Sequence, residues 1–342
     1  QRLIIEIADR VLEDLRWHPV LDVIVDLVDC DNSRLTFSAS EIQKYGRSPW
    51  LAGATGARGS IAEIMRGSLR ATMRGQVSDA VTLLIDTAAP QQGRTHGASR
   101  IEVHPLGAIK ILSMPFHLIV EDETSDGGFL LWMARYTGRD EIIRAYTSGR
   151  FIFRHAGGKG QFPKAASALS YGVWPRLGRP VAAMKLRCGA LMDGDERYLS
   201  HQPNTALMRA TAAHVAFTHI LGCRTIESYV PFKYFRRRLA MDGLGAVADH
   251  YFQLEEDQRK YFAIKSGYLT RGAAPRAQTH SEFVKDMSRP AQERSLFATV
   301  DTALWDKIAG GFGERLSSVF MSPGLRCNPG ERSELTASQA SE

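Results

Sequence analysis

The sequence predicts an α/β protein built on a mostly parallel sheet flanked by helices. From about residue 115 onward, short apolar runs alternate with stretches of helical periodicity, which is the pattern of successive βαβ units. Acidic residues directly follow two of these runs, as is typical of functional groups at the carboxyl ends of parallel strands. At 342 residues the chain is long enough for one large domain or two ordinary ones.

Composition excludes several classes of protein. With 44% hydrophobic and 23% charged residues, the chain is not collagen, a coiled coil or a wholly disordered protein. Four scattered cysteines without a CxxC pair exclude a disulfide framework and a thiolate zinc finger. No apolar run approaches the ~20 residues of a membrane span, and Glu6 and Asp9 interrupt any signal-peptide core. We therefore expect a soluble, cytoplasmic protein.

The net charge of +6 comes from ten Lys and 33 Arg against 37 acidic residues. Arginine binds phosphate through two parallel hydrogen bonds and stacks on bases, which favours a nucleic-acid partner. High-GC codon usage would also enrich arginine, so the charge alone does not decide the function.

We expect residues 1–110 to form a mostly helical accessory region with a surface for docking a partner. Val20 to Val28 continues a helical pattern after Pro19. The expected elements are a helical stretch over 1–30, a loop over 45–60, a basic helix over 61–74, a short buried strand over 80–87 and a linker over 88–100.

Residues 111–270 carry the alternating pattern and are the expected catalytic domain. They are followed by a helical C-terminal extension over 271–322 and a polar, mobile tail over 323–342. The expected strands cover 116–122, 151–155, 181–192 and 219–230, and the expected helices cover 128–136, 165–171 and 206–217.

Two motifs carry the candidate chemistry. In LIVEDETSD (118–126) an apolar strand delivers Glu121 to its tip, and Asp126 follows in the turn. In ALMDGDER (190–197) a second strand ends in Asp193 and Asp195, whose carboxylates would point to the same side of an extended chain and bind a hard cation. Taken singly, a solvated acidic loop or an Asx-type turn explains each motif.

Together the two motifs predict a metal site. Two strand ends of one parallel sheet would bring four carboxylates into one crevice, where their repulsion raises their pKa values. A divalent cation would remove that cost, whereas an acidic loop or a turn offers no such compensation.

The order of strand with Glu121, glycine-rich middle and strand with Asp193 and Asp195 resembles the TOPRIM domain of topoisomerases, bacterial primases and OLD-type nucleases. The fold is Rossmann-like in that family. HAGGKGQ (155–161) and ILGCRTIESYVP (220–231) are similar to the nuclease branch, which includes stand-alone effectors of anti-phage systems. FAIKSGYL (262–269) is similar to a downstream Lys-Gly segment. The resemblance covers about 115–270.

The resemblance implies a nuclease that cuts DNA or RNA with one or two Mg²⁺ or Mn²⁺ ions. Glu121, Asp193 and Asp195 would be the main ligands, and Asp126 and Glu227 would be further ligands or would position water.

Basic residues would act on the phosphate. Lys159, within the glycine-rich segment, would stabilise the pentavalent phosphate, and Lys265 would have the same role. Solvated loop lysines are the alternative. A basic run with neighbouring aromatic rings would grip the phosphate backbone, although a solvated helix face explains it equally well. The expected nucleic-acid contacts are Lys233, Arg236, Arg237, Arg238 and Lys265.

The sequence departs from the family pattern at one point. Glu121 and Asp126 are five residues apart rather than four, and Asp122 replaces a glycine. Glu123 could substitute for one of these acids, so the second ligand after Glu121 stays open.

Other functions compete with the nuclease interpretation. A receiver domain is disfavoured because Asp193 lies 71 residues beyond Asp122. Primase-like nucleotidyl transfer lacks its usual zinc module, and a type IA topoisomerase needs a longer chain. A non-catalytic binding or regulatory module remains the main alternative. Expected partners are a nucleic acid, an ATPase or other regulatory defence partner that holds the effector inactive, and a second copy of the chain, with no membrane.

Overall fold

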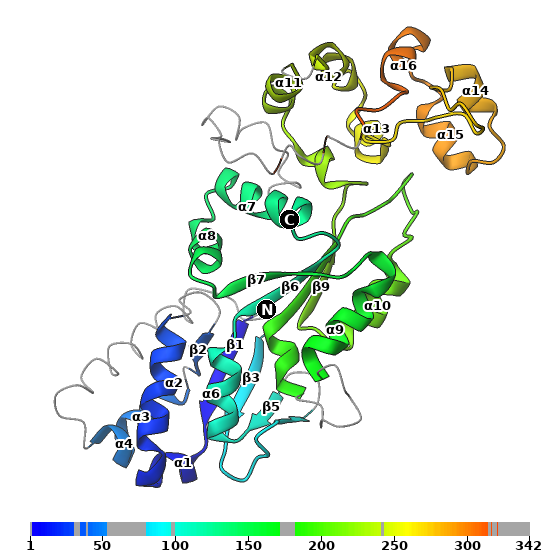
Figure 1. Ribbon diagram of the computed structural model, residues 1–342. Helices are drawn as coiled ribbons and strands as arrows, with labels where there is room; N and C mark the ends of the chain where they lie inside the picture. Colours follow the sequence, from blue (N-terminus) through cyan, green and yellow to red (C-terminus); the bar gives the residue numbers. More distant parts are fainter. Residues whose placement is uncertain are drawn as a thin grey trace.

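The computed structural model describes residues 2–30, 35–38, 40–52, 80–96, 100–171, 182–240 and 243–313, together with Leu316 and Phe320. It contains two mostly parallel sheets with helices packed against them (Figure 1), which confirms the predicted α/β class. The helix expected over 61–74 and the tail over 323–342 lie outside the described residues. None of the described helices has the length and apolar character needed to cross a membrane.

The first sheet has five strands in the order β2-β1-β3-β5-β4, and only the pairing of β4 with β5 is antiparallel. Helices α2 and α6 pack against it through a shared hydrophobic core. Its elements are β1 Arg2–Ile7, α1 Asp9–Glu13, η1 Leu15–Trp17, α2 His18–Cys30, β2 Leu35–Phe37, α3 Ile42–Arg47, α4 Pro49–Ala52, β3 Ala80–Ile85, β4 Arg94–His96, β5 Arg100–Val103 and α6 Pro105–Ser113.

The helical stretch expected over 1–30 is therefore wrong in its first part, which is the strand β1, and the N-terminal region contains a five-stranded sheet where only one strand was expected. Residues Leu3, Ile5 and Ile7 of β1 are buried while Ile4 lies partly exposed between them, so the true period is two rather than 3.6. The segment 88–100 is not a linker, because it contains β4 and the start of β5, which pair with each other. The segment expected as a loop over 45–60 begins instead with the end of α3 and with α4. Helix α2 confirms the helical pattern expected over Val20 to Val28, and β3 confirms the strand expected over 80–87.

The second sheet has four strands, all parallel, in the order β7-β6-β8-β9. The third and fourth strands are shorter than expected, because 3₁₀ helices occupy 182–187 and 226–229. Its elements are β6 Phe116–Val120, α7 Ser125–Tyr136, α8 Asp140–Thr147, β7 Phe151–His155, η3 Lys159–Gln161, α9 Phe162–Tyr171, η4 Ala182–Arg187, β8 Cys188–Met192, α10 Thr205–Ala212, β9 Phe217–Ile220 and η5 Ile226–Tyr229.

Both faces of the second sheet are buried, as expected for a parallel sheet. Helices α9 and α10 cover one face, while α7 and α8 lie on the other (Figure 1). Along β6, Leu118 and Val120 point into the core on the α7 side, whereas Ile119 points into the core formed with α9. The carboxyl ends of all four strands consequently reach one edge of the sheet.

The C-terminal helices extend one of these cores, and their presence agrees with the expected helical extension. Trp305 of α16 and Phe297 of α15 are fully buried in the same hydrophobic cluster as Val120 of β6. The expected boundary at residue 270 therefore does not separate two cores. The helices are α11 Phe232–Ala240, α12 Gly245–Tyr251, α13 Glu256–Tyr261, α14 His280–Lys285, α15 Ala291–Phe297 and α16 Thr302–Ile308.

Two chain segments cross at glycines near the carboxyl edge. Gly267 has φ +59°, and a Cβ built there would lie 2.3 Å from the carbonyl oxygen of Ala309. Gly311, with φ +67°, would place its Cβ 2.4 Å from the amide nitrogen of Gly267. This crossing fixes the segment that carries Lys265, whose carbonyl accepts a hydrogen bond from the N–H of Gly313 at 2.9 Å.

Replacing Gly267 by Ala is expected to destabilise the protein by more than ~1 kcal/mol, because the new side chain meets backbone and the residue has a positive φ. Gly310→Ala is the matched control, since nothing lies within 4 Å of its built Cβ. Urea unfolding of both variants measures the difference. Equal losses of stability would show that the crossing does not require Gly267.

Candidate functional site

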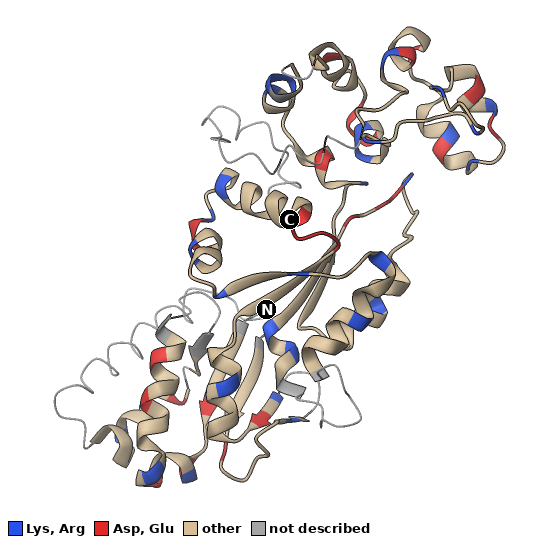
Figure 2. Cartoon of the chain, in the orientation of Figure 1, with Lys and Arg blue, Asp and Glu red and all other residues tan. Residues whose placement is uncertain are grey.

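The acids predicted from the sequence gather at the carboxyl edge of the second sheet. Glu121 follows β6, Asp126 lies in the first turn of α7, Asp193 and Asp195 follow β8, and Glu227 lies in η5 after β9. We call these five residues the acidic edge. Figure 2 shows acidic segments where the strand ends face the C-terminal helices.

Asp193 is the electrostatic centre of the acidic edge. Burial raises the pKa of Asp193 well above its ordinary value, and the charges of Asp126 and Glu227 raise it further. The ammonium groups of Lys159 and Lys265 lower the same pKa. Asp193 therefore interacts electrostatically with two other acids of this edge, and Lys159 interacts with Asp193, Asp195 and Glu121.

Asp126 belongs to the acidic edge, whereas Asp122 does not. Burial raises the pKa of Asp126, and the charge of Glu121 raises it too. Its Oδ2 accepts a hydrogen bond from the N–H of Asp122 at 3.0 Å. Asp122 Oδ1 instead accepts from the N–H groups of Ser125 and Thr124 at 2.7 and 2.9 Å, and the Ser125 hydrogen bond lowers the pKa of Asp122. Asp122 therefore stabilises the turn that starts α7.

Glu123 is also directed to another partner. Its Oε1 accepts a hydrogen bond of 2.6 Å from the N–H of His155 at the end of β7. The geometry therefore favours Asp126 over Glu123 as the second acid after Glu121.

The Asp-Gly-Asp segment is not extended throughout. Asp195 has φ +53°, so the expectation of an extended chain at both aspartates is wrong at this residue. Its N–H donates to the carbonyl of Arg224 at 2.9 Å, which holds the segment against the chain that follows β9. A Cβ at Gly194 would lie 2.5 Å from the carbonyl oxygen of Cys223, so the close approach requires glycine.

Lys159 reaches the acidic edge from the glycine-rich segment. Gly157 and Gly158 have φ of +81° and +96°, conformations that glycine adopts without strain, and they turn the chain into η3. The Lys159 ammonium forms an ion pair with Asp195 and lies 3.6 Å from Glu121. Burial lowers the pKa of Lys159, but the hydrogen bond to Asp195 and the surrounding acids raise it above its ordinary value.

Lys265 provides the second cation. Its Nζ lies 3.1 Å from Oε1 of Glu227, whose side chain is fully buried. No hydrogen bond to either carboxylate oxygen of Glu227 is found within the described residues. Lys265 therefore pairs with a member of the acidic edge.

The predicted basic run lies on α11. Lys233, Arg236 and Arg237 are exposed, and Nε of Arg236 lies 2.6 Å from Oδ1 of Asp249 on α12. The side chain of Arg238 lies outside the described residues. One of the expected phosphate contacts is thus already engaged by a carboxylate of the neighbouring helix.

The donor chemistry of the acidic edge suits a hard divalent cation, because carboxylate oxygens are the ligands that Mg²⁺ and Mn²⁺ prefer. Over the described ranges, no three His, Cys, Asp or Glu side chains already stand in a metal-holding group. Lys159, placed between Glu121 and Asp195, occupies the position of a cation instead. Binding of a metal would require its ammonium group to move.

Asn204 is a site residue that the sequence reasoning missed. Its buried amide Nδ2 donates to Oδ2 of Asp195 and to the carbonyl of Asp193, both at 2.8 Å. It precedes α10 without capping it through its side chain. In the sequence Asn204 stands at the start of a helix, and an Asn at that position ordinarily predicts an N-cap and not a site residue.

Glu293 on α15 is a second missed residue. Its fully buried carboxylate lies 3.1 Å from Nη2 of Arg197, 3.7 Å from Nη1 of Arg289 and 3.8 Å from Nη1 of Arg224. Two of these arginines belong to the segments that hold Asp195 in place. No local sequence pattern announces this contact, because it joins segments far apart in the chain.

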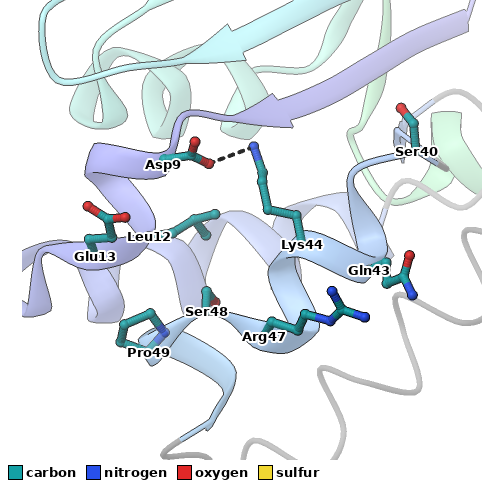
Figure 3. Close-up of a pocket in the computed structure, with 9 residues that line it drawn as sticks. All are labelled: Asp9, Leu12, Glu13, Ser40, Gln43, Lys44, Arg47, Ser48 and Pro49. Atoms are coloured by element: carbon teal, nitrogen blue, oxygen red, sulfur yellow. Dashed lines mark ion pairs between the residues drawn. The ribbon is translucent and has the colours of Figure 1, made fainter.

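A separate hollow of about 470 Å³ lies beside the first sheet, lined by α1 and α3 (Figure 3). Lys44 projects into it and is bound by Asp9 at 3.0 Å, by Glu41 and by the carbonyl of Ile7 at 3.1 Å. The cation is thus satisfied by its own neighbours. Unlike the acidic edge, this hollow contains no concentration of like charge.

No family model, curated protein or solved structure matches this chain. The function must therefore be inferred from the side chains of the acidic edge.

Replacing Asp193 by Asn is expected to raise the melting temperature of the metal-free protein near pH 7.5. Folding raises the pKa of Asp193, so its favourable contribution exists at low pH and is lost as pH rises through the raised pKa. Asn carries no charge, so the gain should shrink toward pH 4.5. We expect ~2–4 °C, which corresponds to about 1 kcal/mol. Thermal unfolding in EDTA across this range measures the gain.

Asp122→Asn is the control, for which a change of melting temperature in the opposite direction is expected. The pKa of Asp122 is lowered on folding, so its contribution is present at neutral pH and is lost as the solution is acidified. If Asp193→Asn lowered the melting temperature at every pH, attraction to the two lysines would outweigh burial and repulsion at this position.

Glu293→Gln is expected to destabilise the protein by about 3–5 kcal/mol, the scale for removing one partner of a buried ionic cluster. The matched control is Glu282→Gln, which removes an exposed pair with Arg276 and should cost far less, because solvent screens that pair. Urea unfolding separates the two. Similar small losses would show that the three arginines do not depend on the buried carboxylate.

Proposed function

We propose that this chain is a metal-dependent phosphodiesterase that cuts DNA or RNA, resembling TOPRIM nucleases. The observation that carries the proposal is the environment of Asp193. Burial and the charges of Asp126 and Glu227 raise its pKa, and these acids follow successive strands of one parallel sheet. Such a concentration of acids is costly to the fold and is relieved when a cation binds.

The group that suits these donors is Mg²⁺ or Mn²⁺, held by Glu121, Asp193 and Asp195, with Asp126 as a further ligand. When bound, such an ion lowers the pKa of a water molecule and neutralises charge on the scissile phosphate.

The lysines have distinct roles in this proposal. Lys159, released from Asp195, presents its ammonium group to the phosphate and stabilises the charge that develops there. Lys265 keeps its pairing with buried Glu227 and so holds that carboxylate in place. Asn204 keeps Asp195 oriented through its amide hydrogen bond.

A nucleic acid suits the rest of the chain. The excess of arginine would attract a polyanion, and the exposed cations of α11 would contact its backbone without reading its sequence. The acids would repel that polyanion unless a cation lies between them.

A non-catalytic nucleic-acid-binding module is the second candidate. It is favoured by the pairing of Lys159 and Lys265 with acids, which neutralises part of the site without a metal. A site used only for binding could retain these pairs permanently.

The N-terminal region up to residue 110 remains a proposed docking surface for a regulatory partner, such as a defence ATPase that holds the nuclease inactive. It is supported by a hydrophobic core around the first sheet that is distinct from the cores of the second sheet, although Met184 of η4 also packs into it. The acids of the second sheet lie outside that core.

Asp193→Asn and Glu121→Gln are each expected to reduce cleavage of labelled DNA or RNA by at least ~100-fold in Mg²⁺ or Mn²⁺, the scale for losing one preorganised electrostatic group. Glu123→Gln should cut at the wild-type rate, since Glu123 bonds to the backbone of His155 instead. Gel assays with and without EDTA measure this.

Cleavage that survives in EDTA, or in both site variants, would reject the assigned site. A wild-type protein that binds nucleic acid but never cuts it, with or without added cellular partners, would favour the binding module.

A further inference from the structure

The segment after Asp195 forms a tight, outward turn. The N–H of His201 donates to the carbonyl of Tyr198 at 3.0 Å, which closes a β-turn with Leu199 and Ser200 at its centre. We call residues 198–201 the Leu199 turn. Leu199 has 78% of its surface exposed, although leucine is among the residue types that are most often buried.

The backbone of this turn is strained. Within the described ranges, the only non-glycine residues with positive φ are Asp195 at +53° and Ser200 at +75°. A turn with positive φ at its third position ordinarily uses glycine or asparagine there. Strain of this kind clusters at functional sites, and here it coincides with the exposed leucine.

An aromatic pair forms the base of the turn. The rings of Tyr198 and His201 are stacked, with centroids 5.1 Å apart and an interplanar angle of 27°. The N–H of Arg197 donates to Nδ1 of His201 at 3.2 Å, which fixes the orientation of the imidazole. Both residues are partly exposed, so this aromatic pair reaches the surface beside the exposed Leu199.

The root of the turn is fixed on both sides of Glu196. Asp195 is held by the carbonyl of Arg224, and the Arg197 guanidinium is held by buried Glu293. Leu199 lies four residues beyond Asp195, so their Cα atoms are within ~14 Å of each other. That distance spans only a few nucleotides of a bound strand.

We propose that the Leu199 turn binds an unpaired base of a single-stranded nucleic acid, next to the proposed cleavage site. Bases stack on aromatic side chains with little regard to sequence, and an exposed aliphatic side chain can lie against the face of a base. This inference rests on the proposed function and adds a preference for single-stranded segments.

The surroundings of the turn favour a nucleic acid over a protein partner. Leu199 is flanked by Tyr198 and Ser200 and belongs to no contiguous apolar run, whereas a protein interface needs several hundred Å² of matched surface.

The test measures binding of labelled single-stranded and fully paired, blunt-ended duplex oligonucleotides, both DNA and RNA, in EDTA so that no cleavage occurs. Leu199→Ala and Tyr198→Ala should each weaken single-strand binding by about 5- to 150-fold, the scale of one lost base-stacking contact. Duplex binding should stay unchanged. Tyr198→Phe keeps the ring and should restore binding.

Met287→Ala is the matched control, because Met287 is equally exposed at 79% but lies in the C-terminal helical region. A single-stranded probe containing 2-aminopurine gives a second readout. Its fluorescence should be quenched by wild-type protein and by Tyr198→Phe, and less so by Leu199→Ala and Tyr198→Ala.

Wild-type affinity in both alanine variants, equal losses on single strands and blunt-ended duplexes, or no single-strand binding by the wild type would each overturn the inference. A change in sedimenting mass with Leu199→Ala would also overturn it, since the turn would then dock a protein. A cleavage assay separates this inference from the proposed function. If the wild-type protein cuts nucleic acid and the alanine variants bind single strands as well as it does, only this inference is rejected. If single-strand binding depends on Leu199 but the wild type never cuts, only the nuclease proposal is rejected.

Discussion

Parallel strand ends impose the constraint on which the rest of the second sheet depends. All four strands of this sheet finish at one edge, so polar groups that follow them must share a small volume. In this protein the shared groups are carboxylates, and partial burial makes their mutual repulsion stronger than it would be in water. Lys159 and Lys265 offset part of that repulsion, and the glycine-dependent turns and crossings around the edge place those two lysines there.

Acidic side chains follow the strands of both parallel sheets, but they are neutralised to different extents. At the end of β3 in the first sheet, Asp86 pairs with Arg10 at 3.0 Å, and Lys44 gathers Asp9 and Glu41. Each acid there has a cation from the same unit. At the edge of the second sheet the acids outnumber the paired lysines, and this imbalance makes the second sheet the natural place for an added cation. The parallel topology is common to both, so the choice of side chains decides the chemistry.

The sequence located the acidic edge because an acid after a buried strand is a local pattern, and parallel topology then brings Glu121 and Asp193 together. It could not separate Asp126 from Glu123, because that distinction depends on the hydrogen bond that Glu123 accepts from the backbone of His155 on another strand. It misread β1, where a run of isoleucines satisfies helical and strand periods alike. Glu293 was out of reach, because its contacts are set by the packing of distant segments and leave no trace in local spacing.

The sharing of one core by β6 and the C-terminal helices has a consequence for how this chain can be inherited. A module that buries its own apolar surface can be gained, lost or exchanged between proteins as a block. The helices that carry Trp305 and Phe297 cannot, because their removal would expose apolar side chains of the hydrophobic cluster that they share with β6. Divergence in this part of the chain is therefore expected to proceed by substitution on the outer faces of the helices, while their number and order persist with the sheet.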